Sequence, residues 1–229
     1  MCSRYTIASK TEVIEARFNI CANYKNFKPV YNVSPGMMVP AITSDEPHKL
    51  QLLRFGLIPS YARKEVCYPE VRIEGPRKEP GKAGIIFSPP YAEHVRTKRC
   101  LIPADSFFTN YLNDKKTPHV VFMREKERPF LMAGIWDEYK SLDGTVTRSF
   151  AIITTMANEV VRQAGCERMP VIVRERNPAS WLDPQNPVTV LSRLVHPYSA
   201  KLMNAYPIDA RVKNVEANDA GLFRPAVTK

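Results

Sequence analysis

The chain of 229 residues is 44% hydrophobic and 24% charged, which is the composition of an ordinary globular domain with a sizeable core. Its 33 Lys and Arg residues exceed its 23 Asp and Glu residues, and the formal net charge of +10 favours a polyanionic partner, because neutralising phosphates releases condensed counterions. No apolar run is long enough to cross a bilayer and the first ten residues lack a signal-peptide core, which excludes a membrane partner and predicts the cytoplasm.

The five cysteines predict free thiols rather than a metal site. Their number is odd, no C-x-x-C pair occurs, and the spacings match no zinc pattern. We therefore expect no metal, no cofactor and a reducing compartment. The cysteines are Cys2, Cys21, Cys67, Cys100 and Cys166.

The first part of the chain predicts a strand, a helix and a second strand ahead of a long loop. Residues 4–8 are expected to form a short strand, and Ser9-Lys10-Thr11-Glu12 resembles a capping box that opens a helix through about residue 18. The apolar run LQLLRFGLI at residues 50–58 predicts a buried strand. Residues 62–84 are charged and rich in proline and glycine, which predicts a surface loop of the kind that is often functional.

The rest of the chain predicts strands in the middle and short helices at the flanks. Segments rich in β-branched and aromatic residues predict strands at 100–102, 119–123, 130–136, 149–155 and 170–173. Helices are expected at 91–98, 158–164, 178–182 and 188–194, and the tail from Tyr206 is expected to be irregular. The pattern indicates one α+β domain over residues 1–229, with a central, mostly antiparallel, barrel-like sheet and flanking short helices.

Cys2 is the first candidate for chemistry, because removal of the initiator Met makes it the first residue. It then carries a thiol and an α-amine on adjacent carbons, which titrate at about 8.5 and about 7.7–8.0. Such an aminothiol condenses with an aldehyde to an imine, and proximity lets the thiol close it to a thiazolidine. Position 2 alone favours an incidental cysteine, but Arg4 would share its side of a strand and is suited to hold a phosphate there.

Seven segments, in order along the chain, strengthen this hypothesis. They are MCSRY at the start, YNVSP at 31–35, FGLIPS at 55–60, EVRIE at 70–74, RCLIPAD at 99–105, TT followed by AN at 154–158, and RMP at 168–170. Together they resemble the motifs of the SRAP family, the SOS-response-associated peptidases: M-C-G-R-F, Y-N-(I/V)-A-P, W-G-L-I-P-S, N-A-R-x-E, R-C-L-I-P-A-D, T-T-x-A-N and R-M-P. The resemblance extends from Cys2 to about Asn214.

The resemblance implies a single SRAP-like domain that binds single-stranded or junction DNA with abasic sites, as a monomer, and is nucleoid-associated when bound. In the family, the cysteine bonds to the ring-opened abasic aldehyde through a thiazolidine, and an autopeptidase activity that removes the initiator Met has been proposed. Carried over by position, Cys2 is the nucleophile. The implied DNA-binding residues are Arg4, Asn32, Pro35, Phe55, Arg72 and Arg168.

Three catalytic positions depart from the family pattern. Glu70 stands where the family has an asparagine, Thr109 where it has the glutamate of D-G-F-Y-E-W, and Cys166 where it has the histidine of H-D-R-M-P. Phe55 replaces the tryptophan of W-G-L-I-P, and it is as well suited to the core as to stacking on a base.

These changes predict impaired acid–base assistance. An ionised Glu70 only accepts hydrogen bonds and would favour the ammonium form of the Cys2 amine. Thr109 cannot shuttle protons as a glutamate does, and Cys166 replaces an imidazole with a thiol. One hypothesis is that Glu70 takes over the lost carboxylate role from a new direction.

Three functions therefore stay open from the sequence. The first is an abasic-site crosslinker that acts through Cys2, with Glu70 or a water moving protons. The second is a degenerate relative that binds single-stranded DNA without efficient covalent chemistry. The third is a thiol peptidase that uses Cys2, which the sequence supports least because the four histidines lie outside every motif and no Cys–His pair is visible.

Overall fold

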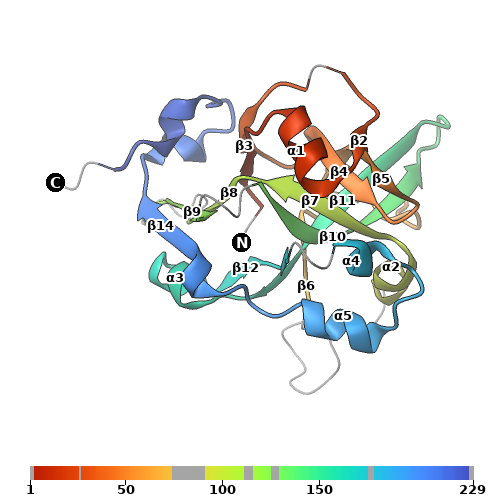
Figure 1. The fold of residues 1–229 in the computed structure, drawn as a ribbon. Helices are drawn as coiled ribbons and strands as arrows, with labels where there is room; N and C mark the ends of the chain where they lie inside the picture. The colour runs from red at the N-terminus through yellow and green to blue at the C-terminus, as the bar shows by residue number, and fades with distance from the viewer. Residues whose placement is uncertain are drawn as a thin grey trace.

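The computed structural model describes residues 3–25, 27–73, 91–110, 116–124, 129–174 and 178–226 (Figure 1). Five of the strands close into a barrel. Antiparallel pairs join neighbours around the ring, and one parallel pair, between the first and the last strand in the order given next, closes it. In ring order the strands are β11 (Val146–Met156), β10 (Phe130–Lys140), β7 (Arg99–Ala104), β4 (Met38–Thr43) and β5 (Glu46–Phe55).

Short strands extend this sheet beyond the barrel. β2 (Cys21–Ala22) pairs with β5, β13 (Ile172–Val173) with β10, and β12 (Arg168–Pro170) with β11. β6 (Glu70–Arg72) runs parallel to β11 from Ile152 to Thr154. Because β6 lies within residues 62–84, the expected uninterrupted loop is wrong there, and residues 74–84 lie outside the described ranges.

The barrel interior is packed closely enough to require a glycine. Strand β10 is buried from Phe130 to Asp137, as expected for a strand covered on both faces. A Cβ at Gly134 would lie 2.6 Å from the Ile102 side chain and 2.7 Å from the Ala151 carbonyl oxygen. Both contacts are shorter than van der Waals distances, so the neighbouring strands approach β10 only because this residue has no side chain.

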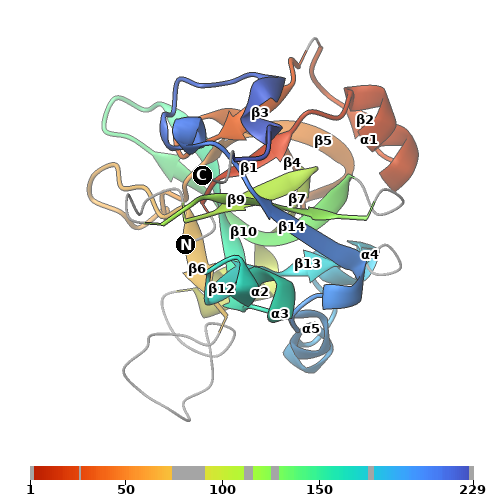
Figure 2. The same ribbon diagram turned by 90° about the vertical axis from the view of Figure 1, so that its left-hand side faces the viewer.

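A second, five-stranded antiparallel sheet lies beside the barrel (Figure 2). Its order is β14 (Met203–Pro207), β9 (His119–Met123), β8 (Ser106–Thr109), β1 (Tyr5–Ile7) and β3 (Val30–Val33). The C-terminal segment covers one face of it with the short helices η3 (Ala210–Lys213) and η4 (Ala220–Phe223). Phe108 and Val120 of the sheet form a small core with Val212 and Leu222. The expected irregular tail is therefore wrong: these residues are ordered by packing against the sheet.

Short helices flank the sheets, and two of them test the capping prediction. α1 (Thr11–Phe18) begins without a side-chain cap, because the hydroxyl of Ser9 donates to Asp105 instead of capping the helix. The expected capping box is thus wrong. α3 (Glu159–Gln163) is capped by Asn158, which accepts from the Val161 N–H at 3.1 Å. The other helices are α2 (Ala92–Thr97), α4 (Pro178–Leu182) and α5 (Val188–Leu194).

The expected α+β fold with a barrel-like sheet is confirmed, as are the positions of the main strands and helices. Strands β2, β3, β4, β6, β8 and β14 were not predicted. Within the described ranges, no helix is long and apolar enough to cross a membrane. In the same ranges, no three His, Cys, Asp or Glu side chains gather as metal ligands would.

One fully buried arginine joins the helices to the barrel. Arg99 of β7 is 0% exposed, and its guanidinium donates to the carbonyl oxygens of Val95, Arg96, Trp181 and Asp183. These carbonyls lie in or beside α2 and α4, so one side chain satisfies acceptors at two helix ends. Burial lowers the pKa of Arg99 from its ordinary value, and the nearby Asp183 opposes this effect.

Replacing Arg99 by lysine is expected to destabilise the fold although the charge is kept. A single ammonium group cannot reach all four carbonyls that the forked guanidinium reaches. Leaving about two buried acceptors unpaired should lower the free energy of unfolding by about 2–3 kcal/mol. Urea denaturation measures this, with the exposed Arg96→Lys on the same segment as control. Equal midpoints for R99K and R96K would contradict the role assigned to Arg99.

Candidate functional site

Two of the expected DNA-contacting arginines, Arg72 and Arg168, lie on either side of Thr154 in β11. Thr154 pairs in register with Arg72 of β6 and with Pro170 of β12. Nε of Arg168 donates to the Thr154 hydroxyl at 3.1 Å, and Nη2 donates to the Thr154 carbonyl oxygen at 2.7 Å. Both arginines are partly exposed, so the structure gathers two cations, from β6 and β12, beside one strand of the barrel.

Glu70 shares a face of β6 with Arg72. Side chains alternate along a strand, and Val71 between them is buried against the barrel. Glu70 lies opposite Ile152 on β11 and is partly exposed. The structure therefore places this carboxylate two residues from Arg72, on the same face of the strand.

Thr109 and Cys166 are both buried, and hydrogen bonds join the segments that contain them. Thr109, at the end of β8, is 0% exposed, and its hydroxyl donates to the Ala164 carbonyl oxygen at 3.1 Å. The Asn110 side chain donates to the same oxygen at 2.7 Å. Cys166 is 8% exposed, and its N–H donates to the Val161 carbonyl oxygen at 3.1 Å. These bonds fasten the segment that leads into β12 to the end of β8.

The N-terminal strand runs along the same β8. The Phe108 N–H donates to the Arg4 carbonyl oxygen at 3.0 Å, and both Ser3 and Arg4 are 5% exposed. The expected nucleophile, Cys2, precedes them and lies outside the described residues. The strand that follows Cys2 and the segment that contains Cys166 thus both contact β8.

Arg4 and Asn32 form a buried network with the C-terminal segment. Nη1 of Arg4 donates to the Asn32 side-chain oxygen at 3.0 Å and to the Val212 carbonyl oxygen at 2.8 Å. The Asn32 amide donates to the carbonyl oxygens of Val212, Asn214 and Ala217 at 3.2, 2.9 and 3.1 Å. Asn32 is 0% exposed and its amide is fully used. The expected DNA contact by Asn32 is therefore corrected: Asn32 anchors the tail.

The expected stacking of Phe55 on a base is also corrected, because Phe55 lies in the core. Its side chain is 0% exposed, stacks on Phe150 with ring centroids 5.2 Å apart, and meets Tyr5 edge-on at 5.5 Å. No face of the ring is left for a base. Pro35 is exposed and lies near Gly56, where an added Cβ would be 3.8 Å from the Pro35 Cβ.

Comparison with known proteins identifies the family. The family model of the SOS response associated peptidases (SRAP) matches residues 1–215. The chain belongs to the SRAP family. It is 31% identical over 229 residues to the abasic site processing protein YoqW of Bacillus subtilis (strain 168), covering 97% of this chain and 99% of that protein. It is 32% identical to the abasic site processing protein YoaM of the same strain, covering 97% of each chain.

Solved structures share the SRAP fold of this chain. A protein from Bacteroides thetaiotaomicron superposes with a TM-score of 0.82 at 24% identity, covering 99% of this chain and all of that one. A protein from Bordetella bronchiseptica superposes with a TM-score of 0.72 at 22% identity, covering 91% of this chain. At these identities the likeness concerns the fold alone, and it agrees with the single domain expected from the sequence.

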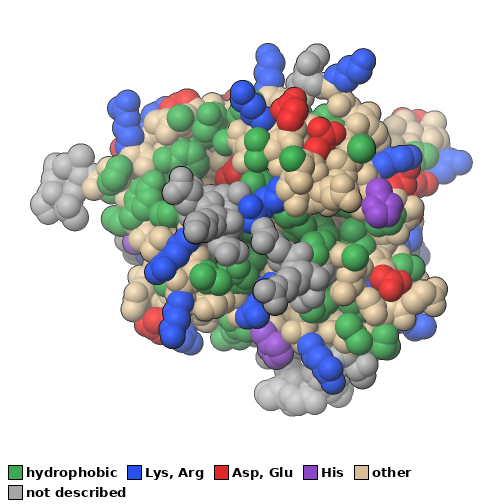
Figure 3. Space-filling view, viewed as in Figure 1, with side chains coloured by type: hydrophobic (Ala, Val, Ile, Leu, Met, Phe, Trp, Pro, Cys, Tyr) green, Lys and Arg blue, Asp and Glu red, His purple; other side chains and the backbone are tan. Residues whose placement is uncertain are grey.

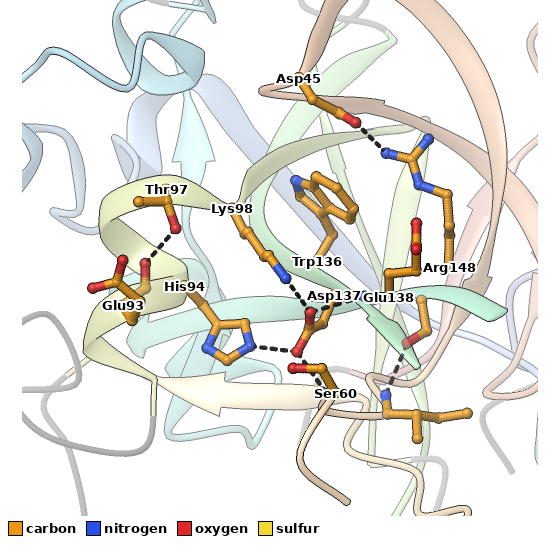
Figure 4. A network of polar contacts seen from close by, with 12 residues as sticks. Asp45, Ser60, Glu93, His94, Thr97, Lys98, Trp136, Asp137, Glu138 and Arg148 are labelled. Carbon is orange, nitrogen blue, oxygen red and sulfur yellow. Dashed lines mark hydrogen bonds and ion pairs between the residues drawn. The ribbon is translucent and has the colours of Figure 1, made fainter. Parts of the chain in front are cut away.

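A network centred on Asp137 holds the segment that enters β6, and the SRAP motifs gave no sign of it (Figure 4). The Asp137 carboxylate accepts from Nε2 of His94 at 2.8 Å, from Nζ of Lys98 at 2.5 Å and from the Ser60 N–H at 2.7 Å. His94 and Lys98 come from α2 and its end, and Asp137 comes from β10. The network therefore fixes Ser60 to the barrel.

From Ser60 the chain is guided back to β11. Leu57 and Tyr68 form an isolated antiparallel bridge, and the Ile152 N–H donates to the Pro69 carbonyl oxygen at 3.0 Å. Glu70 follows at once. The loop that leads to Glu70 and Arg72 is thus held at its far end by Asp137, while the pairing of β6 with β11 sets the places of these two residues beside the barrel.

The surroundings of Asp137 determine its ionisation. Burial alone would raise its pKa, but the hydrogen bonds from His94, Lys98 and the Ser60 and Glu138 N–H groups outweigh that effect and hold the pKa well below 3.8. A carboxyl whose pKa is depressed on folding contributes stability that is fully present above its unfolded pKa. That stability is lost as the pH falls toward the folded value.

Asp137→Asn should therefore lower stability and flatten its acid dependence. At pH 7 the loss of a buried, fully hydrogen-bonded charge should cost about 3 kcal/mol. Below about pH 4 the wild type should lose stability more steeply than the variant, because only the wild type takes up a proton at residue 137 on unfolding. Urea unfolding between pH 3 and 7 measures both effects, with the exposed Asp45→Asn as control. Parallel acid profiles for wild type and D137N would refute this assignment.

Proposed function

We propose that this SRAP protein captures abasic sites in DNA covalently through Cys2, after removal of Met1. Two of the curated relatives it matches over nearly their whole length are named abasic site processing proteins. The observation that carries the proposal is the pairing of Arg72 and Arg168 across Thr154, within a chain that opens with Met-Cys. Two partly exposed guanidinium groups that flank one strand suit the phosphates of a DNA strand.

The chemistry requires only the aldehyde and the aminothiol. The α-amine of Cys2 adds to the ring-opened aldehyde and loses one water to give an imine. The thiol then adds to the imine carbon, its proton passes to the nitrogen, and a thiazolidine results. Holding both nucleophiles on one residue makes the second addition intramolecular. The net change is the release of one water, and neither oxidant nor metal is consumed.

Glu70 is the proposed proton carrier. Thr109 is buried and donates its hydroxyl to Ala164, so it does not supply the carboxylate that other SRAP proteins have at this position. Glu70 lies on the partly exposed face of β6 beside Arg72, where a carboxylate can carry a proton from the amine nitrogen to the hydroxyl that leaves as water. Arg4, mostly buried behind β8, is proposed to orient the N-terminal strand rather than to hold the phosphate by itself.

Cys2→Ala is expected to abolish covalent capture. Met1-processed protein is incubated with single-stranded DNA that carries one abasic site and then run on a denaturing gel. Intact mass confirms the processing, because a retained Met1 blocks the α-amine. The wild type should give a heat-resistant shifted band that intact DNA and C2A do not give. A band of equal strength from C2A would rule out Cys2 as the nucleophile.

Glu70→Gln is expected to slow capture at pH 7 by about tenfold or more, within the usual contribution of a general acid–base group. Glu65→Gln, an exposed change five residues earlier in the chain, serves as control. Rates are taken from the accumulation of the covalent band under single-turnover conditions. Capture by E70Q as fast as by wild type would refute the proton-carrier role and leave that role to water.

The second candidate is a relative that binds single-stranded DNA but has lost covalent chemistry. The structural use of the Thr109 hydroxyl favours it, because this position no longer offers an acid or a base. The protein and DNA of the capture experiment also distinguish the crosslinker from the binding protein. Absence of the covalent band, together with a salt-sensitive shift on a native gel, would support the binding protein. Cleavage of a Met-Cys peptide in trans would support the thiol peptidase.

A further inference from the structure

A cavity of about 190 Å³ lies between β13 and the chain that leaves α5. Three basic side chains line it, Arg174, Arg193 and His196, over a floor that includes Ile172, Leu194 and Tyr198. These basic side chains come from two segments about twenty residues apart, so the fold itself brings them together. On the face shown in Figure 3, blue and purple side chains gather at the lower edge, where α5 lies in Figure 1.

No acidic side chain lines this cavity among the residues that the structure describes. In the same part of the chain, none of the three bases has a hydrogen bond or an ion pair. Other arginines contrast with them: Arg148 is bound to Asp45 at 2.7 Å and Arg211 to Asp219 at 2.6 Å. Among the described residues no counter-charge faces the two guanidinium groups of this cavity, so they repel each other, and a bound anion would relieve that repulsion.

A favourable position at the end of a helix explains the location of only one of these three basic side chains. Arg193 lies in the last turn of α5, where a cation is favoured by the helix dipole. That effect explains neither Arg174, which follows β13, nor His196. The floor is fixed before any ligand arrives: Ile172 pairs with Met132 of β10, and the Tyr198 carbonyl oxygen accepts from the Asn158 amide at 2.8 Å.

We propose that this cavity is a binding site for a single phosphate group. A guanidinium presents paired N–H donors that match phosphate oxygens, and an imidazole can donate through an N–H in either protonation state. The small volume suits one tetrahedral anion over an apolar floor. The phosphate is either free, as inorganic phosphate, or part of the backbone of a DNA strand.

The position of the cavity makes a DNA strand a possible source. Arg174 follows Arg168 by six positions along β12 and β13, a span of at most about 20 Å. A strand held at Arg72 and Arg168 has a second cationic site within that reach. Only this DNA alternative rests on the proposed function; binding of inorganic phosphate does not.

The first measurement is titration of the full-length protein with inorganic phosphate at constant ionic strength, by calorimetry. The pocket variant is Arg174→Gln with Arg193→Gln. The control, Lys49→Gln with Arg162→Gln, removes the same charge from exposed positions elsewhere. Saturable binding by wild type and control, weakened at least tenfold in the pocket variant, is expected. Equal phosphate affinity in wild type and pocket variant, or no binding to either, would overturn the proposal.

The second measurement identifies the source. Affinity for an intact single-stranded oligonucleotide of about 20 nucleotides is measured against salt concentration. If backbone phosphate occupies the pocket, the pocket variant should lower the slope of log K against log[salt] by about 0.7, the value for one lost phosphate contact on a single strand, while the control leaves it unchanged. An unchanged slope with lost phosphate affinity identifies free phosphate as the ligand. Failure of the wild type to bind DNA would count against the proposed function and not against the pocket.

Discussion

Strand β11 is the constraint on which the rest of the molecule depends. Its pairing with β10 and with the parallel β5 closes the barrel at Ser149 and Phe150. A few residues later the same strand receives β6 and β12, with Arg72 and Arg168 on either side of Thr154. Because one strand serves both purposes, the spacing of the two arginines is set by the backbone of the core rather than by a loop. A site built on a packed strand loses little entropy when it binds a ligand.

Buried polar side chains attach the loop, the short helices and the C-terminal segment to the two sheets. Asp137 fixes the loop that enters β6, and Arg99 joins two helix ends to the barrel wall. Arg4 and Asn32 tie the C-terminal segment to the second sheet. Each of these side chains bonds to the backbone of another segment of the chain. The short helices, the tail and the loop lack large apolar faces, so these networks contribute much of what holds them in place.

The features of the fold and site that could be predicted from the sequence are those determined by residues close together in the chain. The long strands β10 and β11 show in their β-branched and aromatic residues, and the motif order placed Arg72 and Arg168 on one site. Asn32 could not be interpreted in the same way, because its partners lie some 180 residues further on. Ser9 left its helix for Asp105, and β6 forms only because β11 offers it an edge. The Asp137 network has no sequence pattern, since its members come from β10, α2 and a loop.

The parallel closure of the barrel also constrains how the chain is made. It pairs Arg54 with Ser149 and Phe55 with Phe150, so the ring cannot close until about two thirds of the chain has left the ribosome. Until then the edge of β5 that pairs with β11 stays open, even after β7 and β10 have joined β4, and open edges are where nascent chains associate wrongly. Non-local pairing of this kind slows folding. For this protein, the rate of synthesis and access to chaperones during translation should govern the soluble yield more than the final stability does.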